Sequence, residues 1–454
     1  MRLLAGVTVF CVIVCRWVTA EEEKPAETSE PVRRSVHFVG GPIYFLPTPP
    51  EIVREMLWLA DAGPEDVVYD LGSGDGRIVI AAVRDFGAKR AVGVELDPAL
   101  IKQSRENAEH SHVSDRATVR EEDLFTSDFS DATVVTLFIG HGPNVSLRAR
   151  LFQLLPPGTR IVSSQAGMGE WKPNKELTTF QTRVGMWGTM APQFPGITDV
   201  PSYSENAWGM NMRSKTFLWV MPAPVAGVWV TEIQTSAGRH ELRLYLTQRL
   251  SDVTGNFEVL GQAPQTGRVE LDIWGDRVRW QCQTQSGQYG KFLVDFEGRA
   301  RGNTMEGRVK VEEDRYTDSA YRWEEERSLT REATDLEGTW SFVHPDDQRS
   351  LELTVEHGDG GTRANLSDGD QRVEIQDFYD FGGGFYFTYL YSDWGRDTKL
   401  TGNPGWLIGK AHVAGDTLTG EVRFYRASHR FNGDKGVKKE KLQTETWSTE
   451  RVRR

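Results

Sequence analysis

The chain has 454 residues, a mean hydropathy of −0.47 and a formal net charge of −12. This length exceeds one domain of about 150 residues, and the acidic balance gives no support to a nucleic-acid partner. Its 45 glycines and 14 tryptophans favour much β-structure with tight turns. Because Cys11 and Cys15 lie in the N-terminal segment, Cys282 alone can form neither an internal disulfide nor a cysteine-cluster zinc site, and we predict no metal.

The N-terminus predicts a targeting segment. Arg2 precedes an apolar run over residues 3–15 that is too short to span a bilayer easily, and Val18-Thr19-Ala20 is a small-residue cleavage site. We therefore predict a secretory signal peptide over 1–20 and a secreted or periplasmic (envelope) protein. The alternatives are an uncleaved anchor, which would attach the protein to a membrane or envelope, and an organelle-targeting segment. Residues 21–40, rich in Glu, Pro and Ser, predict a disordered linker.

Residues 41–224 alternate helical and strand patterns. Expected helices cover 48–63, 76–88, 98–111 and 144–155, and expected strands cover 66–72, 91–97, 132–139, 159–164 and 216–223. A further strand precedes "VREEDLF", which starts at residue 119. Strict alternation favours an α/β domain with a parallel, Rossmann-like sheet and helices on both faces.

From about residue 225 the pattern changes to short alternating strands, and the sequence repeats. "VAGVWVTEI" around Trp229 matches "LEGTWSFVH" around Trp340, 111 residues further on. "GNTMEGRVKV" at 302 matches "GDTLTGEVRF" at 415, and "WEEER" from Trp323 matches "WSTER" from Trp447. We expect two all-β, small antiparallel barrel-like repeat domains, at 225–330 and 335–454, in which first and last strands meet. The four repeated tryptophans are predicted to lie in the cores.

The stretch "YDLGSGDGRIVIAA", residues 69–82, is typical of a ligand-binding loop between a strand and a helix. Gly72, Gly74 and Gly76 are spaced G-x-G-x-G, whereas the dinucleotide fingerprint is G-x-G-x-x-G. Asp70 precedes the first glycine, where a carboxylate would repel a pyrophosphate but suit an ammonium group. The pattern therefore favours S-adenosyl-L-methionine over a nicotinamide cofactor.

Two further acidic positions support a nucleoside ligand. Glu95 ends the second strand, 19 residues beyond the last glycine, where an acidic group accepts hydrogen bonds from ribose hydroxyls. Asp123, or Glu122 beside it, follows the third strand and is placed to accept a hydrogen bond from an adenine amino group.

These motifs resemble class I S-adenosylmethionine-dependent methyltransferases. Together with "YFLPTPPEIVREMLWLA" and "LPPGTRIVSS", they resemble a family with many bacterial members. That family includes the mitochondrial lysine methyltransferases of the ATP-synthase c subunit and the adenine nucleotide translocase. The resemblance extends over residues 44–224 of the 454.

The resemblance implies a seven-stranded sheet with an antiparallel last strand. It implies that Asp70, Gly72, Gly74 and Gly76 line the methionine and ribose side of the cofactor. Glu95 would hold the ribose and Asp123 the adenine. Pro47, Thr48 and Pro49 would close over the methionine end.

The substrate side departs from the family pattern at "FIGHGPNVSL" and "SSQAGMGEW". Candidates for catalytic roles there are Glu51, His141 and Asn144; the alternatives are a helix first-turn carboxylate for Glu51 and a solvated loop histidine for His141. The insertion at 180–215, rich in Trp, Met, Pro and Gly, is either a substrate-side lid or a long surface excursion.

The leading hypothesis is a methyltransferase acting on a protein, by transfer to lysine, with β repeats for docking or envelope attachment. The alternative is a non-catalytic extracytoplasmic binding protein whose β repeats do the binding. A nucleotide-dependent oxidoreductase is a third reading that the glycine spacing disfavours. Export conflicts with a cofactor made inside cells, so a membrane anchor that leaves the catalytic domain on the cofactor side is the alternative location.

Overall fold

The computed structural model describes residues 45–180 and 213–450, except short gaps at 262–264, 287–289, 315–320, 333–334, 344–349, 359–360, 368–371, 376, 392–404, 415–416 and 428–438. The predicted signal segment and linker, and most of the 180–215 insertion, lie outside the described residues. Among the residues that are described, no helix combines the length and the apolar character that crossing a membrane requires.

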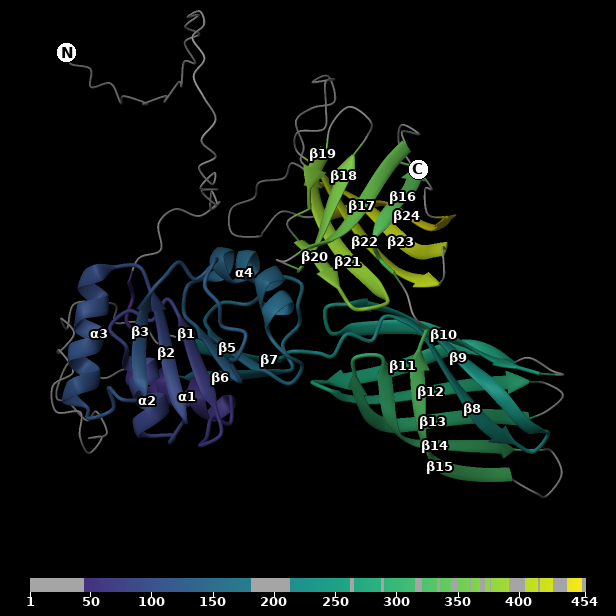
Figure 1. Ribbon diagram of the computed structural model, residues 1–454, viewed down its shortest axis with the longest axis horizontal. Helices are drawn as coiled ribbons and strands as arrows, with labels where there is room; N and C mark the ends of the chain where they lie inside the picture. The colour runs from purple at the N-terminus through teal and green to yellow at the C-terminus, as the bar shows by residue number, and fades with distance from the viewer. Residues whose placement is uncertain are drawn as a thin grey trace, which may run out of the picture. The chain divides into compact units, whose positions relative to one another are not determined.

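The first part of the chain forms a seven-stranded mixed sheet (Figure 1). Its strands are β1 (Val67–Leu71), β2 (Arg90–Glu95), β3 (Ala117–Glu121), β4 (Val134–Leu137), β5 (Arg160–Ser164), β6 (Lys175–Phe180) and β7 (Arg213–Val220). The order is β3-β2-β1-β4-β5-β7-β6, with β1 to β5 parallel and β7 antiparallel to both of its neighbours. The predicted Rossmann-like sheet with an antiparallel last strand is confirmed.

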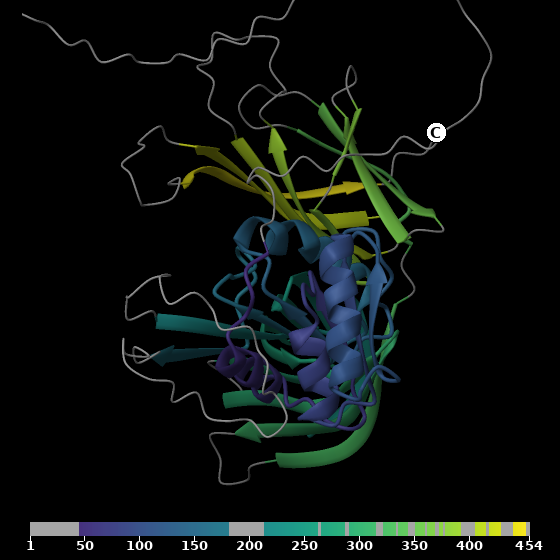
Figure 2. The ribbon, with the colours of Figure 1, turned by 90° about the vertical axis from the view of Figure 1, so that its left-hand side faces the viewer.

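Four helices cover this sheet: α1 (Pro50–Leu59), α2 (Arg77–Arg84), α3 (Pro98–His110) and α4 (His141–Leu154). Proline opens α1 and α3, where its missing N–H costs nothing, and the Asp97 carboxylate caps α3 by accepting from Ala99 N at 2.8 Å. Apolar side chains of α1, α2 and α3 pack in one core, and those of α4 pack in another. Figure 2 faces α3, the long helix in its foreground.

The predicted strict alternation is wrong between β5 and β6, where residues 165–174 form a loop instead of a helix. Without a helix, the face of β5 still has to be covered by apolar side chains. Trp171 of the loop supplies part of it, packing against Phe152 of α4 with ring centroids 4.7 Å apart. Tyr379 and Tyr386, far along the chain, belong to the same core. Aromatic residues of the last β region therefore replace the missing helix.

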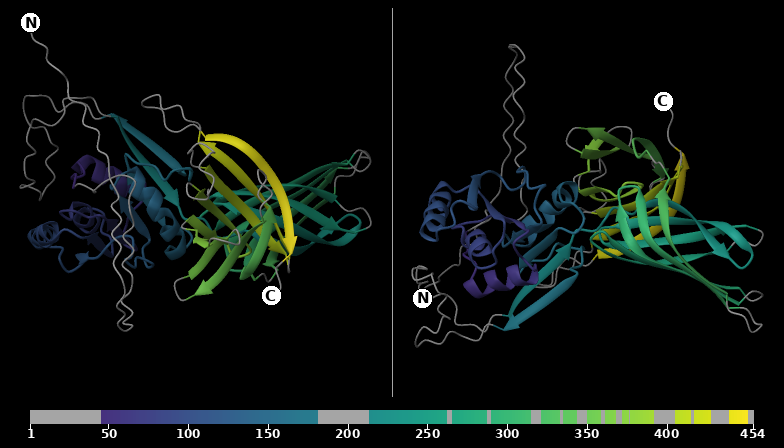
Figure 3. Two further views of the ribbon diagram at one scale, coloured as in Figure 1. Left: turned by 90° about the horizontal axis from the view of Figure 1, so that it is seen from above. Right: turned by 60° about the horizontal axis from the view of Figure 1, so that its bottom comes forward.

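The second part is a closed antiparallel barrel of eight strands (Figure 3). They are β8 (Gly227–Thr235), β9 (Gly238–Arg249), β10 (Asp252–Leu260), β11 (Gln265–Trp274), β12 (Arg277–Ser286), β13 (Gly290–Arg301), β14 (Thr304–Asp314) and β15 (Tyr321–Arg331). As predicted, first and last strands pair, with Trp229 opposite Arg331. The interior is filled by buried side chains, among them Trp229, Trp280 and Phe296.

The last part is not one closed barrel among its described strands, and the prediction of a second small barrel is corrected here. β16 (Gly338–Val343), β17 (Ser350–Gly358), β18 (Gly361–Ser367) and β19 (Arg372–Glu374) form one sheet. β20 (Asp377–Asp380), β21 (Gly384–Tyr391), β22 (Gly405–Ala414), β23 (Thr417–Ala427) and β24 (Lys439–Glu450) form another. The two sheets share one apolar core. The ladder breaks between β19, which pairs with β18, and β20, which pairs with β21.

The repeated Gly-x-Trp signature nevertheless has the same local structure in both copies. Trp229 Nε1 donates to the Val225 carbonyl at 2.8 Å, and Trp340 Nε1 donates to the Leu336 carbonyl at 3.4 Å, four residues back in each case. Both indole rings are buried, as predicted. Trp323 is only partly buried at the margin of the barrel core, and the Trp447 side chain lies outside the described residues.

Candidate functional site

The predicted cofactor residues converge at the carboxyl ends of the parallel strands. Leu71, which follows Asp70 and ends β1, pairs with Val94 of β2 and with Leu137 of β4. Glu95 pairs with Glu121 at the end of β3, two residues before Asp123. In a parallel α/β sheet, ligands bind in the crevice outside these ends. The structure thus brings Asp70, Glu95 and Asp123 to one edge, as the sequence predicted.

The glycine loop is tied to β2 through its amides. Gly72 N and Ser73 N both donate to the Val94 carbonyl, at 2.9 and 3.0 Å, and Gly74 N donates to Glu95 Oε2 at 2.8 Å. A pyrophosphate cradle needs such amides to point at the ligand. Because these donors already have protein acceptors, the loop is unsuited to a dinucleotide, in agreement with its spacing.

The loop also requires glycine at the points of closest approach. At Gly76, φ is +82° and an added Cβ would lie 2.2 Å from Ser104 Oγ of α3. At Gly74, φ is +55° and an added Cβ would lie 2.3 Å from the Phe45 ring. Residues other than glycine rarely adopt these backbone conformations. Glycine therefore lets the loop pack closely against α3 on one side and the N-terminal segment on the other.

Asp70 is a buried carboxylate without a cationic partner among the described residues. Its Oδ1 accepts a hydrogen bond from the Thr136 hydroxyl at 2.7 Å, and the residue is 2% exposed. Burial raises the pKa of Asp70 to about 7, with the Thr136 bond acting in the lowering direction and the charges of Glu95 and Asp75 contributing to the rise. A ligand ammonium group placed here would stabilise the ionised form.

Glu95 and Asp123 are oriented by backbone amides. Glu95 Oε1 accepts from Leu96 N at 2.8 Å and from Asp97 N at 3.0 Å. Asp123 Oδ1 accepts from Phe125 N at 2.9 Å, which fixes the turn after β3. Both carboxylates are therefore pre-oriented hydrogen-bond acceptors, which suits hydroxyl and amino groups of a nucleoside.

Several residues that shape the site were missed by the sequence analysis. Arg77 joins the glycine loop to the N-terminal segment, because its Nη2 lies 2.6 Å from Asp75 Oδ2 and its Nη1 donates to the Thr48 carbonyl at 2.8 Å. Thr48 is buried and Pro47 half-buried at this junction, next to α1. The signal available in the sequence was the run Asp75-Gly76-Arg77 at the end of the glycine loop. The position of Pro47 and Thr48 beside the glycine loop fits their predicted role in closing over the methionine end of the cofactor.

An apolar wall accompanies the polar groups. An added Cβ at Gly72 would lie 2.6 Å from Ile139, beyond β4, and 4.0 Å from Leu124, beside Asp123. Leu96 next to Glu95 is 59% exposed, and Phe45 is 46% exposed. Exposed apolar groups beside polar acceptors suit the faces of an aromatic ligand.

The catalytic candidates occupy different environments. Asn144 is fully buried in α4, where its Nδ2 donates to Ser163 Oγ at 2.9 Å and to the Ala166 carbonyl at 3.1 Å. The exposed His141 begins α4, and its Nδ1 contacts the Gly167 carbonyl at 3.1 Å. Glu51 is exposed in the first turn of α1. Thus α4 begins three residues before the expected helix 144–155, so His141 is a helix residue and not a loop residue, and both His141 and Asn144 contact residues 166–167 after β5.

A third α4 side chain extends this arrangement into the last β region. Arg148 is 3% exposed; its Nη1 donates to the Met168 carbonyl at 3.2 Å and its Nε to the Tyr379 hydroxyl at 2.6 Å. Its Nη2 lies 3.3 Å from Asp377 Oδ2. Although burial opposes its charge, Tyr379 and Asp377 raise the pKa of Arg148.

Glu170, in the same loop, is bound from the other direction. Tyr386 Oη donates to Glu170 Oε1, and Arg249 of the barrel forms an ion pair with Oε2. Burial would raise the pKa of Glu170, but the Tyr386 bond and the charges of Arg249 and Arg148 hold it below its ordinary value. Residues 165–171, which leave the carboxyl end of β5, are therefore held by α4 and by both β regions.

Residues 70–175 match the family model described as ANTKMT methyltransferase domain. A protein-lysine N-methyltransferase of Saccharolobus islandicus is 43% identical over 133 residues, which cover 29% of this chain and 83% of that protein. The adenine nucleotide translocase lysine N-methyltransferase of Mus musculus is 32% identical over 150 residues, 33% of this chain. That match spans 62% of the mouse protein, less than two thirds of its length.

Among solved structures, an RNA methyltransferase of Salinibacter ruber in complex with S-adenosyl-L-homocysteine is 39% identical. The match covers 38% of this chain and 93% of that one, with a TM-score of 0.30.

Proposed function

Since this chain belongs to the ANTKMT family of S-adenosylmethionine-dependent methyltransferases, we propose that it methylates a lysine side chain of a protein. Asp70 is the observation that carries this proposal furthest. It is a buried carboxylate with a raised pKa at the end of β1, next to a glycine loop whose amides are used within the protein. This arrangement fits the ammonium group of S-adenosylmethionine and does not fit a pyrophosphate.

Each residue at the sheet edge would bind a different part of the cofactor. Asp70 faces the ammonium end, Glu95 the ribose hydroxyls and Asp123 the adenine amino group, with Ile139, Leu124 and Leu96 as the apolar wall. The bound cofactor supplies an electrophilic methyl group on a sulfonium that is its own leaving group. The protein has to align the acceptor with that methyl group and exclude water.

A lysine acceptor is supported by two relatives named for protein lysine. Its ammonium group would first lose a proton to water, because only the neutral amine has a lone pair for the methyl carbon. The new N–C bond would form as the C–S bond breaks, which gives a methylated ammonium group and S-adenosyl-L-homocysteine. The acceptor would approach beside α4 and residues 165–171, which flank the carboxyl ends of β4 and β5. His141 and Asn144 would act there by positioning this loop rather than by contacting the amine.

The domain limits are part of this proposal: a methyltransferase domain at 41–224 followed by β repeats at 225–330 and 335–454. The repeated tryptophan hydrogen bond supports the repeat assignment. The N-terminal segment would place the enzyme at the cell envelope, either exported or anchored with its catalytic domain on the cofactor side. N-terminal sequencing of the mature protein, with protease accessibility in intact cells, distinguishes these two locations.

Calorimetric titration with S-adenosylmethionine tests the proposed function. We expect micromolar binding that is lost in Asp70→Ala and in Glu95→Ala, with Asp276→Ala, on the barrel, as a matched control that binds normally. Mass spectrometry of protein and RNA acceptors incubated with enzyme and cofactor then identifies the methylated group. A folded wild-type chain that binds no cofactor would refute the proposal and favour the binding-protein alternative.

A further inference from the structure

Gln165, the first residue after β5, has a backbone conformation that few residues other than glycine adopt, with a φ of +65°. Three other non-glycine residues among those described have positive φ, and each has an ordinary reason. Asp61 and His112 follow the residues that cap α1 and α3, and Leu250 lies in the two-residue turn between β9 and β10. Gln165 ends no helix and lies in no hairpin turn, so local turn geometry does not account for its strain.

The surroundings hold Gln165 in this conformation. Its backbone N donates to the Lys215 carbonyl at 2.7 Å, and Nε2 of its side chain donates to Ser214 Oγ at 2.8 Å. Ser214 is fully buried, whereas Gln165 is exposed. A residue with a strained backbone persists only where its neighbours fix it, and such residues concentrate at functional sites. The conformation therefore indicates a function for the Gln165 side chain.

Gln165 lies at the same edge of the sheet as the predicted cofactor residues. Asp70 of β1 pairs with Thr136 of β4, and Thr136 pairs with Val162 of β5, three residues before Gln165. Two strand spacings, about 10 Å, therefore separate the strand of Asp70 from the strand that ends at Gln165. Both residues lie at the carboxyl ends of their strands, where ligands of such sheets bind. An acceptor amine that approaches beside β5 would therefore meet Gln165.

Two hydroxyl groups next to Gln165 lack hydrogen-bond partners. Ser164 of β5 lies directly opposite Thr216 of β7, and both residues are buried. In the part of the chain that the structure describes, neither Ser164 Oγ nor Thr216 Oγ1 has a partner, although buried polar groups are nearly always bonded. Because side chains alternate along a strand, this pair lies on the same face of the sheet as Asp70. Unsatisfied polar groups therefore adjoin Gln165 on the face that carries Asp70.

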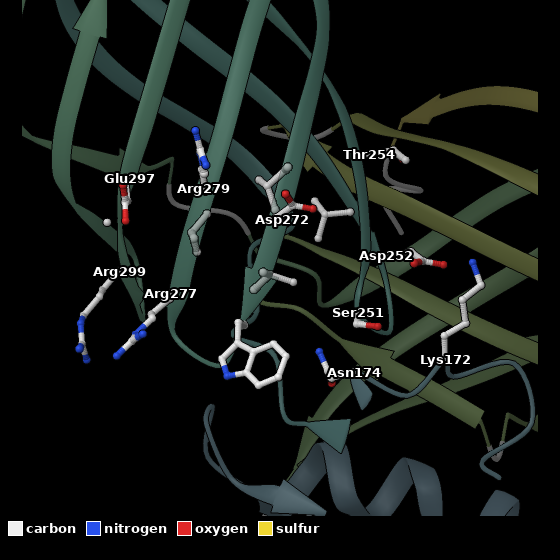
Figure 4. A pocket seen from close by; sticks show the side chains of 16 residues that line it. Lys172, Asn174, Ser251, Asp252, Thr254, Asp272, Arg277, Arg279, Glu297 and Arg299 are labelled. Atoms are coloured by element: carbon white, nitrogen blue, oxygen red, sulfur yellow. The ribbon is translucent and has the colours of Figure 1, made fainter. Parts of the chain in front are cut away.

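The rest of the loop leads away from this edge. Within residues 165–171, Gln165 alone has an exposed polar side chain. Asn174 accepts from Val220 N at 2.8 Å, and Val220 lies opposite Arg160 at the start of β5. Asn174 also lines a pocket of about 980 Å³ together with barrel residues (Figure 4). The end of the loop thus belongs to the opposite end of β5, and only its beginning lies at the carboxyl edge.

We propose that Gln165 binds the acceptor amine and aligns it with the methyl group of the cofactor. Its Nε2 is used by Ser214, whereas its Oε1 has no donor among the described residues. This oxygen would accept a hydrogen bond from an N–H group of the amine. The Ser214 bond and the fixed backbone would hold the amide in place before the acceptor arrives. The proposal rests on the function proposed above, because it names the residue that recognises the amine.

A neutral amide suits an amine that has to lose its proton before it reacts. A carboxylate in this position would stabilise the ammonium form and raise the pKa of the acceptor. The amide oxygen accepts the N–H bond with less stabilisation of that charge. After the proton has left to water, the nitrogen lone pair forms the N–C bond as the C–S bond breaks. The hydrogen bond to Gln165 would keep the nitrogen in line with the methyl carbon during this step.

Two analogues of S-adenosylmethionine test this proposal on the full-length protein. Both have nitrogen in place of the sulfonium sulfur. One carries a 2-aminoethyl group in place of the methyl group, and the other carries a propyl group of nearly the same shape. The aminoethyl probe places an amine where the acceptor nitrogen would lie, so the ratio of the two affinities reports amine recognition. By calorimetry, we expect the wild type to bind the aminoethyl probe at least tenfold more tightly than the propyl probe.

Gln165→Gly should reduce this ratio to less than threefold, because it removes the amide and keeps a residue suited to the backbone conformation. Gln165→Glu should keep or increase the ratio, because a carboxylate accepts the same hydrogen bond and attracts a charged amine. His112→Gly is the matched control at another exposed residue with positive φ, and it should leave the ratio unchanged. A wild-type ratio near one, an unchanged ratio in Gln165→Gly, or an equal loss in Gln165→Glu or His112→Gly would overturn the proposal.

Titration with S-adenosylmethionine separates this proposal from the proposed function. The wild type and the three variants should bind the cofactor equally, which also shows that the variants are folded. Normal cofactor binding with equal affinities for the two probes refutes the role of Gln165 alone. If the folded wild type binds no cofactor, the proposed function is refuted, and the role of Gln165 is refuted with it.

Discussion

Asp70 lies in β1 and Glu170 in the loop after β5, and the pKa values of these two carboxylates move in opposite directions. Asp70 has a hydroxyl partner, and its pKa rises to about 7. Glu170 has Tyr386 and Arg249 as partners, and its pKa falls below its ordinary value despite burial. The first carboxylate lies at the ligand edge, and the second lies where the sheet meets the β regions.

The two carboxylates show two uses of charge withdrawn from water. A buried carboxylate without a cation opposes folding at neutral pH, so its retention indicates a ligand cation that completes it. A buried carboxylate with a matched cation and a hydroxyl donor connects segments distant in sequence instead. Three substitutions test this contrast.

Replacing Arg148 should have the largest effect on stability. Arg148→Met removes the cation from a buried cluster with Asp377, Tyr379 and the Met168 carbonyl, and such a loss costs about 3–5 kcal/mol. The measurement is urea unfolding followed by tryptophan fluorescence. Arg299→Met is the matched control, since Arg299 pairs with Asp276 while about half exposed, and it should cost less than about 1 kcal/mol. Equal losses of stability in the two variants would contradict the role of Arg148 in connecting α4 to the last β region.

Asp70→Asn should stabilise the cofactor-free protein at pH 8. Because the folded pKa is raised from 3.8 to about 7, the folded state binds more protons than the unfolded state between those values. The wild-type stability therefore falls as pH rises through this window, by at most about 4 kcal/mol. Asparagine still accepts the Thr136 hydrogen bond and carries no charge.

Urea unfolding at pH 4 and pH 8 checks this prediction. The asparagine variant should gain stability over wild type mainly at pH 8, and its affinity for S-adenosylmethionine should fall about 100-fold, or about 2.7 kcal/mol. A variant that is less stable than wild type at pH 8 would show that Asp70 supports the fold.

Glu170→Gln should lower the stability of the protein at neutral pH, the opposite direction to Asp70→Asn, and by a smaller amount. Glutamine keeps the shape but loses the charge that Arg249 faces, at a cost of about 1–2 kcal/mol at pH 7. Since the folded pKa is lowered, the wild-type advantage exists above the unfolded pKa of 4.5 and disappears as pH falls through the folded value. Unfolding curves at pH 3 and pH 7 measure the difference. An equal loss at both values would mean that packing, not charge, is responsible.

The cofactor site could be predicted because its determinants are local. The glycine spacing at 72–76, the leading Asp70 and the acidic strand ends at Glu95 and Asp123 all follow directly from strand–turn–helix units. Parallel pairing then brings those strand ends to one edge without further information. The N-terminal segment joined by Arg77 was harder to predict, since its contact with Thr48 crosses 29 residues.

The substrate side could not be predicted in the same way. His141 and Asn144 were interpreted as candidate catalytic residues near the acceptor, but α4 begins at His141 and directs both side chains to residues 166–167. Nothing near Arg148 in the sequence indicates that its partner is Tyr379, 231 residues away. Such contacts depend on how separate parts of the chain pack.

The α/β sheet, the ligand class at its edge and the two tryptophan-anchored β regions follow from the sequence, because periodicity and spacing act within tens of residues. The placement of aromatic residues of the last region over β5, in place of a helix, follows from the packing of distant segments. The same is true of the separation of β16–β19 from β20–β24, and of the end of the β10–β11 pairing at Gly255 and Val269 although both strands continue. Each of these depends on register or on long-range packing, which no local pattern encodes.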